Sequence, residues 1–250
     1  MAISLKNLQK NHLRPPRIII HGGPGIGKTT FCAGAPAPVF VPTEDGLGGL
    51  DVPAFPLATS LDDVTSALEA LRTEEHQYRT VVIDSLDWLE PLVWQHVCQA
   101  AGKASIEDFG YGRGYVEALG VWRRVFDLLT RLRDERGMIV LLTAHSQIVH
   151  VEDPTLPAYD RHDLKLHRRA AGMAEEYADI ILFATLRAGV ITEDAGRGAK
   201  RARATTSGER IMHTVGQPAF LSKNRYNLPT PLPLEWSALE EAIADGNSRR

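Results

Sequence analysis

The strongest constraint on the fold comes from residues 17–35, where an apolar run, a glycine-rich turn and a potential helix follow one another. Arg17-Ile18-Ile19-Ile20 is short and rich in β-branched residues, which predicts a buried strand. Residues 22–30 read Gly-Gly-Pro-Gly-Ile-Gly-Lys-Thr-Thr, and the residues from Phe31 to Ala35 can open a helix. The spacing from Gly22 to Gly27-Lys28-Thr29 is that of a phosphate-binding P-loop, which requires this strand–turn–helix context.

The turn has the composition of a site for a nucleoside triphosphate and Mg²⁺. Glycines let backbone N–H groups turn inward around phosphate oxygens, and a helix that begins near Lys28 adds its positive dipole end. Lys28 is expected to reach the β- and γ-phosphates, and the Thr29 hydroxyl to bind Mg²⁺. We therefore expect ATP and Mg²⁺ as cofactors. The expected nucleotide-binding residues are Gly22, Gly23, Pro24, Gly25, Ile26, Gly27, Lys28, Thr29 and Thr30.

The composition indicates one globular unit without a global basic field. The 250 residues are enough for a single large core, and a net charge of −3 means that any nucleic-acid affinity must come from local patches. Cys32 and Cys98 fit neither a metal nor a disulfide pattern, which favours a reducing cytoplasm. No apolar run reaches membrane-spanning length, and the N-terminus does not resemble a signal peptide, so no membrane partner is expected.

Strand and helix patterns alternate along most of the chain. Apolar strand candidates lie at residues 17–21, 39–42, 80–84, 138–144 and 179–185, with helical spacing of apolar residues between several of them. This alternation predicts an α/β fold with a mainly parallel, twisted sheet covered by helices. After residue 185, residues 189–191 and 210–215 predict a β-hairpin. We expect a single domain with a core at about 15–185, a hairpin and strands at 186–236, and a short helix and tail at 237–250.

Two carboxylates follow predicted strands at positions suited to nucleotide chemistry. Asp84 ends the apolar run 80–83, where a carboxylate joins the Mg²⁺ shell. The next residue is Ser85, whereas many ATPases of the AAA+ type place a water-activating Glu directly after this Asp. Glu44 follows another strand candidate, and parallel sheets bind ligands at the carboxyl ends of their strands. Glu44 is therefore the candidate for contact with the γ-phosphate.

This arrangement resembles that of the RecA-like P-loop ATPases. Among them the chain is most similar to phage-encoded, core-only recombinase or single-strand annealing ATPases, over about residues 15–240. The resemblance implies that Lys28 and Thr29 form the P-loop pair and that Asp84 is the Mg²⁺-shell carboxylate. It also implies that Glu44 orients the attacking water. The run that ends at His145 matches the strand that senses the γ-phosphate, with His145 where RecA has Gln.

Lys223 and Arg225 match a second feature of that family. RecA-like rings and filaments often carry two cations with one residue between them, which reach the nucleotide of the neighbouring subunit. Residues i and i+2 of a strand point the same way, so both cations can face one phosphate group. The resemblance implies an arginine finger that acts in trans and requires a head-to-tail homo-oligomer. The alternative is a surface strand with two solvated cations.

The resemblance further implies two loops that contact single-stranded DNA. The first is expected near residues 103–115 and the second at about 147–169. Residues 197–203 are densely cationic and form either a further DNA contact or a solvated hairpin tip. Trp88 and Trp94 are expected to lie in the core. The expected DNA-binding residues are Lys103, Tyr111, Arg113, Lys165, Arg168, Arg169, Lys200, Arg201 and Arg203.

The residues and the resemblance predict a cytoplasmic, DNA-stimulated ATPase that supports homologous recombination or strand annealing in phage DNA metabolism. Single-stranded DNA, further copies of the chain and a single-strand-binding protein are the expected partners. A hexameric helicase-like or switch-type ATPase with the same fold is the main alternative, and a small-molecule P-loop kinase is a weaker one. The sequence does not distinguish a ring from a filament, or strand annealing from strand exchange. It also leaves open whether DNA or RNA is preferred.

Overall fold

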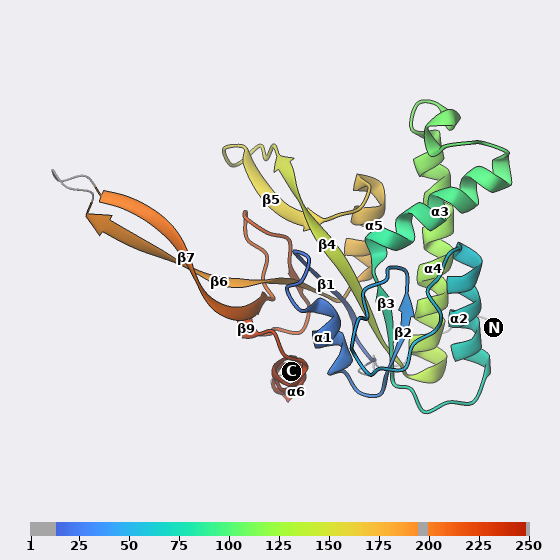
Figure 1. Cartoon of the computed structure of the whole chain (residues 1–250), viewed down its shortest axis with the longest axis horizontal. Coiled ribbons are helices and arrows are strands. Elements are labelled where there is room, and N and C mark those ends of the chain that lie inside the picture. The colour runs from blue at the N-terminus through green and yellow to red at the C-terminus, as the bar shows by residue number, and fades with distance from the viewer. Residues whose placement is uncertain (1–13, 195–199, 249–250) are drawn as a thin grey trace, which may run out of the picture.

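The computed structural model describes residues 14–194 and 200–248, with a nine-stranded sheet between two layers of helices (Figure 1). The strands are β1 (Arg17–Gly22), β2 (Pro38–Pro42), β3 (Thr80–Asp84), β4 (Ile139–Val151), β5 (Tyr159–Leu164), β6 (Ile180–Asp194), β7 (Lys200–His213), β8 (Lys223–Asn224) and β9 (Leu232–Pro233). The helices are α1 (Lys28–Ala33), α2 (Leu61–Thr73), α3 (Leu86–Ala101), α4 (Arg113–Arg136), α5 (Arg168–Tyr177), α6 (Trp236–Ser248) and the 3-10 helix η2 (Ile106–Phe109).

Five parallel strands form the centre of the sheet in the order β2-β3-β4-β1-β6. The mainly parallel, helix-flanked sheet predicted from the sequence is thus confirmed. From β1 the chain leaves toward β2, whereas after β4 it continues to β6 on the other side of β1. The β1–β4 pair is therefore the topological switch point, where open parallel sheets bind their ligands. Gly22, the last residue of β1, pairs with His145 midway along β4, where the parallel pairing of these two strands ends.

Burial on both faces explains why the central strands read as continuous apolar runs. On β1, Ile19 belongs to a large core that includes residues of α2, α3, α4 and α5. Ile18 and Ile20 belong to a smaller core with residues of α1 and α6. Successive residues of a strand point to opposite faces of the sheet, so all three isoleucines are fully buried.

The first turn of α3 lies near the carboxyl ends of the parallel strands, because the helix begins two residues after β3 ends. Helix α2 follows β2 at a greater distance and begins with a complete capping box. Ser60 accepts a hydrogen bond from the Asp63 N–H at 3.2 Å, and the Asp63 carboxylate accepts one from the Ser60 N–H at 2.9 Å. Among the described residues, no helix has both the length and the apolar character needed to cross a bilayer.

Two segments differ from the predicted secondary structure. Residues 147–169, predicted as a long loop, form the outer part of β4, the antiparallel strand β5 and the start of α5. The predicted hairpin strands are longer than expected, because β6 runs without a break from the parallel core to Asp194 and pairs with β7. The resulting ribbon projects from the body of the molecule (Figure 1). The apolar pattern ends where the core ends, but backbone pairing continues both strands beyond it.

Candidate nucleotide-binding site

The glycine-rich turn joins β1 to α1 at the switch point. At Gly22 a β-carbon would lie 2.5 Å from the carbonyl oxygen of Ala184 in β6, so only glycine allows this approach of the two strands. Gly27, directly before α1, has a φ of 110°, which glycine adopts at little cost. Of the predicted nucleotide-binding residues, Gly23, Pro24, Gly25 and Thr30 are exposed, and Ile26, Gly27 and Thr29 are half-buried. The turn is therefore accessible to a phosphate chain.

Lys28 lies along the inner side of this turn. Its ammonium donates hydrogen bonds to the carbonyl oxygens of Gly22 at 3.2 Å and Gly23 at 3.1 Å, and only 6% of the residue is exposed. Burial lowers the pKa of Lys28, and the carboxylates of Asp84 and Glu44 oppose this shift. A buried cation held by two carbonyl oxygens is placed to exchange these weak acceptors for phosphate oxygens.

Asp84 binds two hydroxyl groups. Thr29 Oγ1 donates to Asp84 Oδ2 at 2.9 Å, and the hydroxyl of Thr143 on β4 donates a short hydrogen bond to Asp84 Oδ1. Hydroxyl and carboxylate oxygens of this kind fit Mg²⁺, which takes few protein ligands and keeps waters and phosphate oxygens. The structure thus brings together the predicted Mg²⁺ residues Thr29 and Asp84. Thr143 was not predicted, because a threonine inside an apolar strand has no distinguishing sequence signal.

Glu44 reaches the same region from the end of β2. The N–H groups of Thr43 and Glu44 donate to the Asp84 carbonyl oxygen at 2.8 and 3.3 Å, and the Thr43 hydroxyl donates to the Ser85 carbonyl oxygen at 2.6 Å. These bonds hold the ends of β2 and β3 together. Burial raises the pKa of Glu44; the charge of His145 opposes the shift and that of Asp84 adds to it. A half-buried carboxylate with a raised pKa is suited to accept a proton from water.

His145 completes the group from β4. Its Nδ1 lies 2.9 Å from Asp87 Oδ2, and its backbone N–H donates to Asp87 Oδ1 at 2.9 Å. Asp87, in the first turn of α3, was not predicted as a site residue. The sequence does place a second carboxylate three residues after Asp84. Acidic residues are common at the start of a helix, so this position alone did not indicate a role in the site.

Arg210 of β7 and Leu234 also approach the turn without having been predicted. A β-carbon added at Gly27 would lie 3.3 Å from Arg210 Nη1 and 3.7 Å from Leu234 Cδ2. A guanidinium group and an apolar side chain thus flank the turn beside the start of α1. They come from segments far from the P-loop in sequence, so only the fold reveals the contact.

A family model described as an AAA domain matches residues 14–226, which include every residue of the site described so far except Leu234. The chain belongs to this AAA-domain family. Membership supports the predicted P-loop ATPase class, with ATP binding and hydrolysis as the general activity. No curated protein matches the chain.

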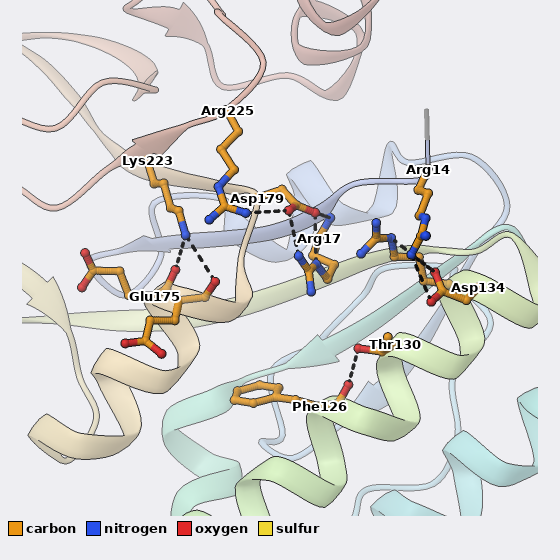
Figure 2. A network of polar contacts seen from close by, with 11 residues as sticks. Arg14, Arg17, Phe126, Thr130, Asp134, Glu175, Asp179, Lys223 and Arg225 are labelled. Atoms are coloured by element: carbon orange, nitrogen blue, oxygen red, sulfur yellow. Dashed lines mark hydrogen bonds and ion pairs between the residues drawn. The ribbon is translucent and has the colours of Figure 1, made fainter. Parts of the chain in front are cut away.

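The cation pair of this AAA domain lies near the amino ends of β1 and β6, whereas the P-loop follows the carboxyl end of β1. Figure 2 shows the contacts of the two cations. Lys223 Nζ donates to the Glu175 carbonyl oxygen at 2.6 Å, at the end of α5. Arg225 Nη1 is 3.5 Å from Asp179 Oδ1, and Asp179 is also bound by Arg17 at 2.8 Å. Arg17 starts β1 and the P-loop follows its end, and a strand of 6 residues at about 3.3 Å per residue places its two ends roughly 16 Å apart. The two cations therefore contact different partners, away from the P-loop of their own chain.

The first predicted DNA loop of the AAA domain is partly helical. Lys103 follows α3 and is exposed, Tyr111 has a fully exposed ring, and Arg113 begins α4. Lys103 and Arg113 line a hollow of about 700 Å³, together with Arg124 of α4. The structure thus gathers three cations around one hollow, which Asp108 and Glu117 also line.

The second group of predicted DNA contacts lies around the base of the β4–β5 hairpin. Lys165 follows β5, and Arg168 and Arg169 begin α5; all three side chains are exposed. On β7, the backbones of Lys200, Arg201 and Arg203 pair with Asp194, Glu193 and Ile191, respectively. The side chains of this β7 segment, and residues 197–199, lie outside the described part of the chain, so their contact with DNA stays a prediction.

Trp88 is 53% exposed, so the prediction that it lies in the core is wrong. Trp88 follows Asp87 on α3, and the turn of the helix directs Trp88 outward while the side chain of Asp87 is buried.

Trp88 and Lys165 line a groove of about 470 Å³, together with Trp94 and Glu90. Burial raises the pKa of Glu90 to about 7, although its carboxylate accepts a hydrogen bond from a backbone N–H at the start of α5. The groove thus combines an exposed indole with an exposed ammonium.

Proposed function

We propose that this AAA domain is a RecA-like ATPase that binds single-stranded DNA and acts in homologous recombination or strand annealing in phage DNA metabolism. The observation that carries the proposal is the position of Glu44. The strand next to β3 supplies a carboxylate beside Asp84, which is followed by Ser85 and not by Glu. This is the arrangement that the resemblance to RecA-like ATPases implies.

In the proposed reaction, Glu44 orients a water molecule in line with the γ-phosphorus and accepts its proton. The new bond forms between the water oxygen and phosphorus, while the bond to the β–γ bridging oxygen breaks and ADP leaves. Lys28 neutralises charge on the transferred phosphoryl oxygens. Thr29 and Asp84 would hold Mg²⁺, which would supply further positive charge to the phosphates.

Single-stranded DNA is the proposed partner of the groove between Trp88 and Lys165. An exposed indole offers a surface on which any base can stack, and an adjacent ammonium can pair with the backbone phosphate. Arg168 and Arg169 extend the exposed cations along the start of α5. Because stacking and phosphate contacts do not read base identity, the groove is expected to bind without strong sequence preference.

Trp88→Ala is expected to weaken binding of an oligo-dT strand by about tenfold or more, since stacking of one base contributes ~1–3 kcal/mol. The measurement is fluorescence anisotropy of a labelled strand at fixed salt, alongside ATPase rates with and without DNA. DNA stimulation should weaken and basal turnover should persist, because the indole is largely exposed on α3. Leu57→Ala is the matched control, because Leu57 is 46% exposed and precedes α2. Equal DNA binding by both variants would exclude the groove.

We further propose that Arg225 completes the ATP site of a neighbouring subunit in a head-to-tail assembly. Its partner Asp179 is independently held by Arg17, through the backbone N–H at 3.1 Å and the guanidinium at 3.1 and 2.8 Å. Asp179 therefore stays paired when Arg225 turns toward another chain. Lys223 is bound to the carbonyl end of α5, which suits a helix-capping role.

Arg225→Ala is expected to lower ATPase activity of the assembled protein by about 10–100-fold. An arginine finger contributes ~10³–10⁵ in other ATPases, and we expect a smaller loss because Lys28 keeps its charge at the phosphates in this variant. ATP binding should be unchanged. Mixing this variant with Lys28→Ala subunits should restore part of the activity, because each chain supplies what the other lacks. Arg14→Ala is the matched control, since Arg14 forms an exposed pair with Asp134 at 3.4 Å. The absence of recovery in the mixture would contradict action in trans.

A further inference from the structure

Asp87 has more polar partners than a helix start requires. Its side chain is 3% exposed, and it accepts hydrogen bonds from the His145 backbone N–H, from His145 Nδ1 and from Ser85 Oγ, each at 2.9 Å. Lys165 Nζ lies 3.9 Å from Asp87 Oδ2. Burial alone would raise the pKa of Asp87, but the hydrogen bonds from His145 outweigh it and lower the pKa. Asp87 is therefore a carboxylate at neutral pH.

An ionised Asp87 fixes which nitrogen of the imidazole carries a hydrogen. A carboxylate only accepts hydrogen bonds, so the Nδ1 of His145 must be the donor. Nε2 is then the nitrogen left for another group, and within the described part of the chain no hydrogen bond to Nε2 is found. The backbone of His145 pairs with Gly22, the first residue of the P-loop, and the charge of its ring acts on Glu44, so the imidazole lies at the candidate nucleotide site.

We propose that Asp87 is a positioning residue for ATP hydrolysis, which holds His145 so that Nε2 meets the terminal phosphoryl group. The inference rests on the proposed ATPase function of the same site. A neutral imidazole with hydrogen on Nδ1 presents a lone pair at Nε2, which a phosphate repels. The doubly protonated ring presents an N–H instead, and in that form Nδ1 donates to Asp87 while Nε2 donates to the phosphate. With Nδ1 held by Asp87, the protonated ring offers an N–H donor at Nε2. A glutamine side chain offers such a donor from its amide without protonation.

Other charged groups lie close to this pair. The charge of His145 acts on the carboxylate of Glu44 after β2, and Lys165 Nζ lies 3.9 Å from Asp87 Oδ2. Asp87 differs from these groups in making direct hydrogen bonds to the ring and to the backbone of the same residue. It therefore fixes the orientation of the ring.

The chain contains its own control for a role that is merely structural. Ser60-Leu61-Asp62 begins α2, as Ser85-Leu86-Asp87 begins α3, so both aspartates occupy the second helical position. Asp62 is exposed, whereas Asp87 is directed at His145. Both carboxylates occupy the same position relative to the positive end of the helix dipole. A difference between the two substitutions therefore reports the contact with His145 and not helix capping.

The test compares Asp87→Asn, His145→Gln, the double variant and Asp62→Asn in the full chain. We expect Asp87→Asn to lower kcat by about 10–100-fold with little change in KM, as loss of an orienting partner does. The glutamine amide donates without Asp87, so the double variant should be no slower than His145→Gln alone. Asp62→Asn should match the wild type. Independent, multiplicative losses in the double variant would overturn the proposal, as would equal effects of Asp87→Asn and Asp62→Asn.

A second readout does not depend on turnover. In the nucleotide-free chain, ¹⁵N NMR of His145 should show hydrogen on Nδ1, and Asp87→Asn should convert this signal to a mixture of tautomers. An unchanged signal in the variant would overturn the positioning role even if ATP is hydrolysed normally. A wild-type chain that binds ATP but never hydrolyses it would instead refute the proposed function, while the NMR comparison still decides whether Asp87 controls the ring.

Discussion

Lys28→Ala is expected to lower ATP turnover by about 10³-fold or more, the largest effect predicted for a single side chain. The ammonium is nearly buried and bound to the carbonyl oxygens of Gly22 and Gly23, where bulk water screens charge poorly. Alanine leaves the charge of a bound triphosphate without this counter-charge. Phosphate release at saturating ATP and binding of a fluorescent ATP analogue measure the two consequences separately.

The fold of this variant should survive, because burial lowers the pKa of Lys28 and so shows that the folded turn disfavours the charge. The temperature of unfolding is therefore expected to be unchanged or slightly higher without nucleotide. Arg131→Ala on α4 removes an exposed cation and serves as the control for a general loss of charge. Hydrolysis at the wild-type rate by Lys28→Ala would contradict the assignment of residues 22–30 as the phosphate-binding loop.

The central sheet could be predicted from the sequence because burial on both faces leaves an unambiguous apolar signal. Ile18, Ile19 and Ile20 are all fully buried, and each central strand shows a similar run. The outer part of β4 and the β6–β7 ribbon lack that signal, since their residues are paired through the backbone beyond the core. An apolar pattern reports burial and not backbone pairing, so strands that leave the core were predicted too short or as loops.

The site divides in the same way. The P-loop, Asp84 and Glu44 were predictable because each follows a strand, and the ends of parallel strands meet at one edge. Asp87 and Arg210 were not, because an acidic residue at a helix start and an arginine on a strand have common explanations on the surface. Only the contacts of Asp87 with His145, and of Arg210 with the turn at Gly27, distinguish them.

Glu44→Gln is expected to reduce hydrolysis by about 10²–10⁴-fold while ATP still binds, because an amide can orient water but cannot accept its proton. Asp45→Asn is the matched control, since Asp45 is the adjacent carboxylate and is exposed. Rapid-quench assays and equilibrium nucleotide binding separate the chemical step from affinity. Equal losses of activity in both variants would mean that residues 44 and 45 matter for the local structure and not for the chemical step. Loss of ATP binding in Glu44→Gln would contradict the role of Glu44 as a base.

The pH dependence gives a second, independent measure of the same residue. The pKa of Glu44 is raised chiefly by burial, and a base must be ionised, so turnover of the wild type should fall as the pH drops through that raised pKa. The small residual rate of Glu44→Gln should lack this acidic decline. For stability the sign is opposite: a raised pKa means that the folded chain prefers the neutral carboxyl, so removing the charge should leave the neutral-pH unfolding temperature equal or higher. A Glu44→Gln chain that is inactive yet no less stable than the wild type is the result that links Glu44 to chemistry rather than to folding.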